Sequence, residues 1–330
     1  MRKIKLGIYG CGTIAEVHAK AISDIADAEL FSVADLNPSA AQRFAAAHGC
    51  ASCESIDALL GIADIDAISI CTPNGTHASL AIKALGAGKN VILEKPMAIT
   101  VAECDEIIEA VRASGKRLTV ISQMRTSPDV LRAKEIVDSG VLGKIVLAEL
   151  AMRYYRGAEY YKGSWRGTRS MDGGGALMNQ GVHGVDLLAY LMGEVKSVQS
   201  VVRTLLHDIE VEDTAAATLE FECGALGVIT ASTAAHPGFD REIKICGTRG
   251  ALELCEDKLV RLVVDGKEEP CEKFVSHGGA GSNLLLDTAG HKRQISSFIR
   301  AIRGDEMSYV NEYDGRRAVS LIERIYKNTI

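Results

Sequence analysis

The sequence has few of the features that mark membrane-bound, secreted or nucleic-acid-binding chains. Aromatic residues make up only 5% of its 330 residues, and no apolar run approaches the roughly 20 residues that span a bilayer. The N-terminal segment lacks the apolar core of a signal peptide. The net charge of −6, without any basic run, gives no electrostatic reason to bind nucleic acid or an anionic membrane. We therefore expect a cytoplasmic protein with no nucleic-acid and no membrane partner.

Disulfide and metal frameworks are also lacking. The nine cysteines are scattered, and an odd number without regular spacing indicates reduced thiols. Cys50 and Cys53 form a C-x-x-C motif, but no second pair or histidine cluster follows at zinc-site spacing. We predict no metal. The motif is expected to hold small buried or half-exposed side chains, with a redox or metal role as the alternative.

Residues 1–122 alternate short apolar runs with amphipathic stretches. The runs expected to be buried strands are 3–9, 28–35, 66–72, 90–94 and 117–122. The stretches between them show the apolar spacing of helices and end near glycine or a polar residue. Such alternation is typical of βαβ units with right-handed crossovers. It predicts an α/β domain built on a doubly wound parallel sheet.

After residue 122 the pattern changes. A strand is predicted at 144–155, and from 196 to about 272 strand follows strand with short turns between. Short turns favour a largely antiparallel sheet. The predicted helices are 128–140, 175–192, 291–304 and 313–327. We assign residues 123–330 to a second, α+β domain with a large, mostly antiparallel open sheet.

A glycine turn lies between the first predicted strand and helix. It reads G-x-G-x-x-A from Gly10 through Gly12 to Ala15, and it places Thr13 and Ile14 at the helix start. The first glycine permits a tight turn and the second lets the backbone approach a pyrophosphate at the helix N-terminus. The motif in this context predicts a dinucleotide site.

The acidic residue Asp35 ends the second predicted strand, 20 residues beyond Ala15. A carboxylate there can hold both hydroxyls of an adenosine ribose and would repel a 2′-phosphate. Leu36 and Asn37 follow without an arginine to bind that phosphate. The pattern predicts NAD rather than NADP. A tight turn with a helix-capping aspartate is the structural alternative.

The stretch "VILEKPMAIT", residues 91–100, ends an apolar strand with a charged pair. Glu94 and Lys95 follow three apolar residues, and Pro96 then stops the strand. Buried charges are costly unless they are paired or used. In a doubly wound sheet, ligands bind beyond the carboxyl ends of the strands, which is where this pair is expected to lie.

These motifs, with "CTPNGTHA" (71–78) and "GGGALMNQGVHGVDLL" (173–188), give a chain that resembles the Gfo/Idh/MocA oxidoreductases over nearly its whole length. The resemblance implies an N-terminal Rossmann domain that binds NAD. It also implies a C-terminal domain that binds a carbohydrate-like substrate and forms homodimers or homotetramers through its sheet.

The resemblance also implies roles for the first domain's residues. Lys95 matches the family's catalytic lysine, which polarises the substrate hydroxyl or joins a proton relay. Glu94 and Lys95 are also expected to line the cofactor site beside the nicotinamide, where Glu94 orients the strand end. A cis Lys95–Pro96 bond is compatible with the turn. The family's turn that lines the nicotinamide ribose and pyrophosphate corresponds to Thr72, Pro73 and Asn74. His77 either contacts the cofactor or touches only backbone.

In the second domain, helical spacing places Asn179, His183 and Asp186 or Leu187 on one face. The resemblance makes His183 the acid–base residue that takes the hydroxyl proton. Many sugar and inositol dehydrogenases of the family have aspartate where Asn179 stands. An amide cannot ionise but can hold a hydroxyl and orient a neighbour, so Asn179 counts against an inositol-type assignment.

The loop before this helix holds Trp165, the only tryptophan, and Arg166. In the family this loop comes near the nicotinamide and the substrate. An arginine suits a carboxylate or phosphate, and an aromatic face suits a sugar ring. Arg125 and Arg169 could serve similarly, or form ordinary salt bridges.

The leading hypothesis is an NAD-dependent dehydrogenase that acts on a secondary hydroxyl of a sugar, sugar acid, cyclitol or nucleotide sugar. One alternative is an enzyme of the same family that retains NAD, either a glycosidase or a sugar–sugar redox enzyme. Another is a non-catalytic dinucleotide-binding sensor. The presence of both Lys95 and His183 counts against the sensor.

Overall fold

The computed structural model describes residues 2–276, 288–305 and 308–330. By internal packing the chain divides into two compact units. The first comprises Met1–Gln123 and Leu285–Arg316, and the second comprises Met124–Leu284 and Arg317–Ile330. The first segment of the first unit ends at Gln123, one residue after the boundary expected at residue 122. The first unit also takes in a late segment that the sequence analysis had assigned to the second domain.

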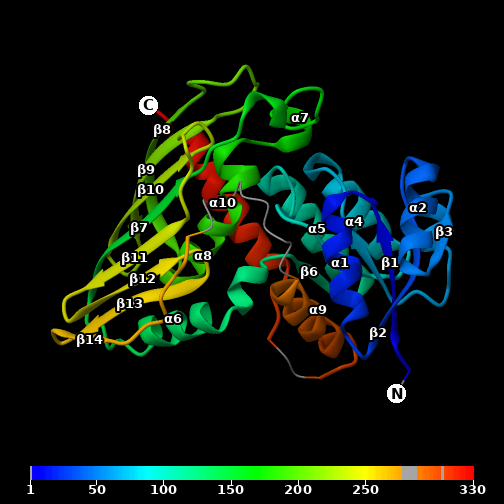
Figure 1. The fold of residues 1–330 in the computed structure, drawn as a ribbon, viewed down its shortest axis with the longest axis horizontal. Helices are drawn as coiled ribbons and strands as arrows, with labels where there is room; N and C mark the ends of the chain where they lie inside the picture. The colour runs from blue at the N-terminus through cyan, green and yellow to red at the C-terminus, as the bar shows by residue number, and fades with distance from the viewer. Residues whose placement is uncertain (1, 277–287, 306–307) are drawn as a thin grey trace. The chain divides into compact units, whose positions relative to one another are not determined.

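The first unit is built on a six-stranded parallel sheet in the order β3-β2-β1-β4-β5-β6 (Figure 1). Its strands are β1 (Ile4–Tyr9), β2 (Ala28–Ala34), β3 (Ala51–Cys53), β4 (Ala67–Ile70), β5 (Asn90–Leu93) and β6 (Leu118–Val120). The predicted doubly wound fold is confirmed. The short strand β3 was missed because its sequence, Ala-Ser-Cys, carries no apolar run.

The crossover helices of this unit are α1 (Thr13–Ser23), α2 (Pro38–His48), α3 (Ile56–Leu60), α4 (His77–Gly86) and α5 (Val101–Ser114). Local chemistry sets their ends. The side chains of Asn37 and Thr100 cap the starts of α2 and α5, and Gly49 and Gly115 end these helices in the left-handed conformation.

Helix α9 (Ala289–Ile302) belongs to the first unit and packs on helix α1. Ile295, Phe298 and Ile299 of α9 are buried in the same apolar cluster as Ile22 of α1. Burying each such side chain stabilises the fold by about 1.5–3 kcal/mol. The Rossmann unit is therefore completed by residues that lie far along the chain.

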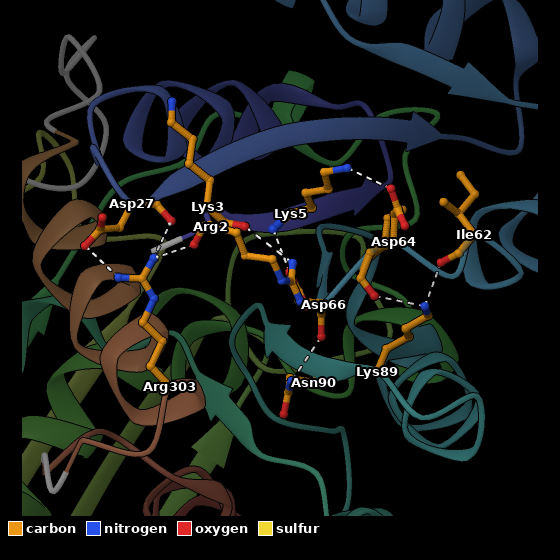
Figure 2. A network of polar contacts seen from close by, with 11 residues as sticks. Arg2, Lys3, Lys5, Asp27, Ile62, Asp64, Asp66, Lys89, Asn90 and Arg303 are labelled. Carbon is orange, nitrogen blue, oxygen red and sulfur yellow. Dashed lines mark hydrogen bonds and ion pairs between the residues drawn. The ribbon is translucent and has the colours of Figure 1, made fainter.

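The amino ends of the strands carry a network of paired charges (Figure 2). Arg2 binds Asp66 through both terminal nitrogens, at 2.8 and 2.5 Å, and Arg303 from the end of α9 pairs with Asp27 at 2.8 Å. Lys89 donates to the carbonyl oxygen of Ile62. These contacts tie the amino-terminal edge of the sheet together, at the end opposite the glycine turn.

The second unit is built on an eight-stranded sheet in the order β14-β13-β12-β11-β7-β10-β9-β8 (Figure 1). Its strands are β7 (Ile145–Arg153), β8 (Val195–Arg203), β9 (Thr214–Phe221), β10 (Leu226–Ser232), β11 (Glu242–Gly247), β12 (Gly250–Cys255), β13 (Lys258–Val264) and β14 (Lys267–Glu269). Every neighbouring pair is antiparallel except β7 with β10. The predicted open, mostly antiparallel sheet is confirmed.

Helices α6 (Pro128–Asp138) and α8 (Val182–Met192) pack on this sheet, α8 against β7 and α6 against β13. Helix α10 (Glu312–Lys327) spans the boundary between the units. The predicted helix 175–192 is divided: a π-helical turn, η4 (Ala176–Gln180), precedes α8, and Gly181 separates them. Among the described residues, no helix is long and apolar enough to cross a membrane.

Candidate active site

The glycine turn has the conformation that a dinucleotide site requires. Gly10 has φ +91°, and a Cβ there would lie 2.7 Å from the carbonyl oxygen of Cys71. At Gly12, by contrast, a Cβ would meet nothing within 4 Å. Gly12 forms the N-cap of α1 without a side-chain hydrogen bond. The helix N-terminus is thus open to an anion such as a pyrophosphate, with Thr13 and Ile14 in its first turn.

Asp35 is half-buried just after β2, where the sequence analysis placed it. Its carboxylate accepts hydrogen bonds from the backbone N–H of Cys11 at 2.7 Å and of Asn37 at 2.8 Å. The acid therefore fixes the glycine turn directly. A carboxylate oxygen can accept more than one hydrogen bond, so this geometry is compatible with ribose hydroxyls as further donors.

The turn after β4 is held from within. The hydroxyls of Thr72 and Thr76 lie 2.7 Å apart, and Thr76 also donates to the carbonyl oxygen of Pro73. Thr72 and Pro73 are half-buried, and Asn74 is buried. Three of the predicted cofactor residues therefore sit on one short, rigid turn at the carboxyl end of the sheet.

His77 is fully buried at the start of α4. Its Nδ1 lies 2.7 Å from the carbonyl oxygen of Pro96 and its Nε2 lies 3.0 Å from that of Thr72. Burial lowers the pKa of His77, while these two carbonyls oppose that shift. The contacts favour the backbone-touching interpretation: His77 joins the Thr72 turn to the Lys95 turn.

Lys95 is delivered by strand β5 as the sequence predicted. It is half-buried, whereas Glu94 before it and Pro96 after it are buried. The Lys95–Pro96 peptide bond is cis. The backbone N–H of Lys95 donates to the Oε2 atom of Glu94 at 3.1 Å. Glu94 therefore orients the turn that carries the lysine.

Glu94 in turn belongs to a buried cluster that joins three distant segments. Its Oε1 lies 2.9 Å from the Nε2 of His18 and 3.7 Å from the Nε2 of His291. Ser69 Oγ lies 2.7 Å from the other ring nitrogen of His18. The potential ligand atoms of these two histidines and Glu94 lie within 4.8 Å of one another. The sequence could not show this grouping, because its members are not close in sequence.

Hydrogen bonding accounts for the protonation of this cluster. Burial lowers the pKa of His18, although the carboxylate of Glu94 opposes the shift. Burial pushes the pKa of Glu94 upward, but the histidine hydrogen bonds outweigh it and hold that pKa well below its usual range. A neutral His18 that donates to an ionised Glu94, and accepts from Ser69, satisfies all three side chains.

In the second unit, the π-helical turn η4 is fixed by the buried carboxylate of Glu212. It accepts hydrogen bonds from the backbone N–H of Gly175 at 2.9 Å and of Leu177 at 2.8 Å, and from the hydroxyl of Tyr326 at 2.9 Å. Burial raises the pKa of Glu212, while these donors oppose the shift. A Cβ at Gly175 would lie 1.8 Å from the carbonyl oxygen of Glu212, so only glycine fits.

Asn179 lies in η4 rather than on the helix of His183. It is buried, and its Nδ2 donates to the Oδ1 atom of Asp172 at 2.5 Å. Asp172 ends the short helix α7 (Arg169–Asp172) and also accepts from the backbone N–H of Gly167 at 2.8 Å. The sequence analysis did not identify Asp172.

His183 begins α8 and is half-buried, while Val182 and Gly184 beside it are buried. Asp186, expected on the same face, is buried with Arg125 in a two-bond ion pair at 2.7 and 2.6 Å. These contacts assign Asp186 and Arg125 to the interior of the second unit. The salt-bridge alternative for Arg125 is the one the structure supports.

The loop with Trp165 and Arg166 is built on aromatic and guanidinium contacts. Arg166 lies over the ring of Tyr160 at 4.7 Å and over that of Trp165 at 5.1 Å. The hydroxyl of Tyr160 accepts from the Nε2 atom of Gln180 at 2.7 Å, which ties the loop to η4. Arg169 instead binds Glu210.

Comparison with known proteins adds to this geometry. Residues 4–122 match a family model described as "Oxidoreductase family, NAD-binding Rossmann fold". Residues 130–253 match the "GFO/IDH/MocA C-terminal domain". The chain belongs to the GFO/IDH/MocA oxidoreductase family. The predicted membership is confirmed, and as a GFO/IDH/MocA oxidoreductase the chain is an NAD-dependent enzyme.

Individual GFO/IDH/MocA relatives cover almost the whole chain. The chain is 29% identical to inositol 2-dehydrogenase of Rhizobium meliloti over 331 aligned residues. The alignment covers 97% of this chain and 95% of the relative. It is 26% identical to myo-inositol 2-dehydrogenase of Thermotoga maritima, in an alignment that covers 96% of this chain and 94% of that protein. The crystal structure of the WlbA dehydrogenase from Bordetella pertussis, in complex with NADH and UDP-GlcNAcA, has a TM-score of 0.86 at 32% identity. It covers 99% of this chain and 96% of that chain.

The residues of the first unit fit the NAD that the GFO/IDH/MocA fold implies. Gly12 leaves open space at the N-terminus of α1, and the Asp35 carboxylate lies beside the same turn. The anion-binding end of a helix and a ribose-binding acid are the two elements that recognise a dinucleotide. The prediction of NAD is confirmed at the level of the family.

Proposed function

We propose that this oxidoreductase transfers a hydride between nicotinamide and a secondary hydroxyl of a sugar, sugar acid, cyclitol or nucleotide sugar. One observation carries the assignment of roles. Lys95 and His183 are each half-buried between buried neighbours, so each segment leaves one titratable side chain within reach of solvent. A side chain that must exchange a proton with a small molecule needs to come within hydrogen-bonding reach of it.

NAD, when bound, supplies the carbon that accepts the hydride. Residues of the chain itself accept the proton of the substrate hydroxyl and stabilise the charge that develops on its oxygen. His183 accepts the proton of the substrate hydroxyl as general base, and the cation of Lys95 stabilises the oxygen as it becomes negative. Asn179 holds a hydroxyl by hydrogen bonding and does not titrate. Trp165 and Arg166 provide an aromatic face and a cation for a sugar ring and an anionic substituent.

The relatives support a polyol or sugar-nucleotide substrate without choosing between them. Two are named inositol dehydrogenases, and the WlbA complex holds UDP-GlcNAcA. Asn179 is an amide where many inositol dehydrogenases of the family have an ionisable aspartate. This difference favours a sugar nucleotide over an inositol as the substrate. Arg166 offers a charge for a carboxylate or phosphate.

The alternatives within the family differ in what becomes of the cofactor. An enzyme that retains NAD, a glycosidase or a sugar–sugar redox enzyme, would use Lys95 and His183 without releasing NADH. A non-catalytic sensor would bind the dinucleotide and show no turnover. The sensor is disfavoured by the presence of both Lys95 and His183.

The test is to incubate the purified protein with NAD and a panel that includes myo-inositol, UDP-GlcNAcA, simple sugars and sugar acids. We expect NADH to accumulate with one of them, and Lys95→Met to slow that accumulation by about 10²–10⁴-fold while calorimetry still shows NADH binding. Binding of NADH without NADH accumulation on any panel member, together with cleavage of an added disaccharide or aryl glycoside, would support the NAD-retaining glycosidase. NADH binding with neither would support the sensor.

A further inference from the structure

Asp172 and Asn179 form a buried pair in the second unit. Asp172 is 1% exposed and Asn179 is 7% exposed. The amide nitrogen of Asn179 lies 2.5 Å from one oxygen of Asp172, and the other oxygen accepts from the backbone N–H of Gly167. A carboxylate only accepts hydrogen bonds, so the amide must turn its nitrogen toward Asp172.

This contact fixes which atom Asn179 can present elsewhere. Because one N–H of the amide is donated to Asp172, the carbonyl oxygen of Asn179 is turned away from that carboxylate and acts there only as an acceptor. A freely rotating amide could present either atom. The same carboxylate holds Gly167, which directly follows Trp165 and Arg166. One buried acid thus orients both the amide and the loop.

The contact also explains the amide itself. An aspartate at position 179 would place two carboxylates within hydrogen-bonding distance in a buried setting. Two such groups cannot both ionise, and they share a proton with one pKa strongly raised. The ionisable acid at this place in the second unit is therefore Asp172, and the amide at 179 is its matched partner.

We propose that Asp172 is a positioning residue for substrate binding, and that it is the reason position 179 carries asparagine. The carboxyl group and the amide can therefore be exchanged between positions 172 and 179 without losing their hydrogen bond. The role of Asp172 toward substrate rests on the proposed function, but the pairing itself does not.

The first test needs no substrate. Thermal unfolding is followed at pH 5 and pH 8 for Asn179→Asp, Asp172→Asn and the double exchange Asp172→Asn/Asn179→Asp. In Asn179→Asp the shared proton raises one folded-state pKa above its unfolded value, so stability is present at low pH and lost as pH rises. We expect this variant to melt lower at pH 8 than at pH 5, relative to the native protein.

The double exchange restores one carboxylate and one amide, so we expect it to recover thermal stability and to remove the added pH dependence. Gln180→Glu is the matched control. It adds a charge in the same turn but beside Arg156, which donates to Gln180 at 2.6 Å, and should add no loss at pH 8. A double exchange no better than the single changes would overturn the proposal, as would an Asn179→Asp protein with native pH dependence.

The second test uses the panel member that yields NADH. Asp172→Asn should lower kcat/KM by about 10²-fold, the cost typical of a misplaced binding group, as measured by steady-state NADH formation. The double exchange should recover most of that loss. If no panel member is turned over, the proposed function fails while the melting experiment still decides on the pair. If Asp172→Asn turns over normally, the positioning role is wrong.

Discussion

Replacing Lys95 removes a charge with little change in packing, because its side chain is half-buried between two buried residues. Lys95→Met should lower kcat by about 10²–10⁴-fold, the range that general acid–base groups contribute. Stopped-flow measurement of the hydride step checks this, with thermal unfolding as the control for folding. A kcat that stays within about tenfold of the native value would assign the role to another residue.

The cofactor preference depends on the single carboxylate of Asp35. The N–H groups of Cys11 and Asn37 donate to different oxygens of Asp35. Asp35→Asn keeps an acceptor for only one of them and removes the charge that repels a 2′-phosphate. We expect NADH to bind more weakly and NADPH more tightly, measured by calorimetry with both. Asp57→Asn, at an exposed site of the same unit, should change neither affinity. An unchanged NADH-to-NADPH ratio in Asp35→Asn would contradict the assignment.

At the scale of elements, the end of β5 is coupled to α1 and α9 through the Glu94 cluster. The unfolded chain takes up protons at ordinary pKa values, about 6.5 for histidine and about 4.3 for glutamate. Both His18 and Glu94 have folded pKa values below these. Their contribution to stability is therefore present above about pH 6.5 and is lost as the pH falls.

Glu94→Gln should destabilise the first unit by about 1.5–3 kcal/mol at pH 7, the value of hydrogen bonds to a charged group. Because glutamine does not titrate, the variant should lose less stability than the native protein between pH 5 and pH 3, the range around and below the unfolded carboxyl pKa of about 4.3. Chemical denaturation at these pH values measures both effects. Equal losses would mean that Glu94 does not hold a depressed pKa in the folded state.

Strands and helices were predictable where their burial requires an apolar run or an amphipathic repeat in the sequence. That covers β1, β2, β4, β5 and β6 and the glycine turn between β1 and α1. The sequence gives no comparable signal for η4, because Ala-Leu-Met-Asn-Gln continues the apolar spacing of α8. The backbone of this turn is held by Glu212, which lies 35 residues after Leu177. Asp172 and the partners of Glu94 were missed for the same reason: their contacts are set by the fold.

At the scale of the molecule, helices α6 and α8 pack on the eight-stranded sheet, and in the described part of the chain alternate residues of its strands are half-buried or exposed on the opposite face. Val201, Ala216, Thr230 and Ala151 form a cross-strand row on this outer face. They are half-buried or exposed, whereas their neighbours Ala215, Ala217, Ile229 and Ala231 are buried on the other side. A flat row of small side chains suits a second copy of the same sheet, as the expected homodimer or homotetramer requires.

Ala216→Arg should reduce the expected dimer or tetramer to smaller species without unfolding the chain, because two arginine side chains, one from each copy, would meet across each two-fold interface. Light scattering coupled to gel filtration measures the mass. Glu222→Arg, in the turn after β9, changes charge away from the row and should leave the mass unchanged. A native protein that runs as a monomer would refute the interface.

The late return of the chain into the first unit has a consequence for how the protein is made. The cofactor-binding sheet ends at Val120, yet helix α9 and His291 that complete its packing come only after Ala289. During synthesis the glycine turn leaves the ribosome early, but its domain must wait for most of the second unit before it can close. The nascent Rossmann half is therefore expected to need a chaperone's protection until translation is almost finished.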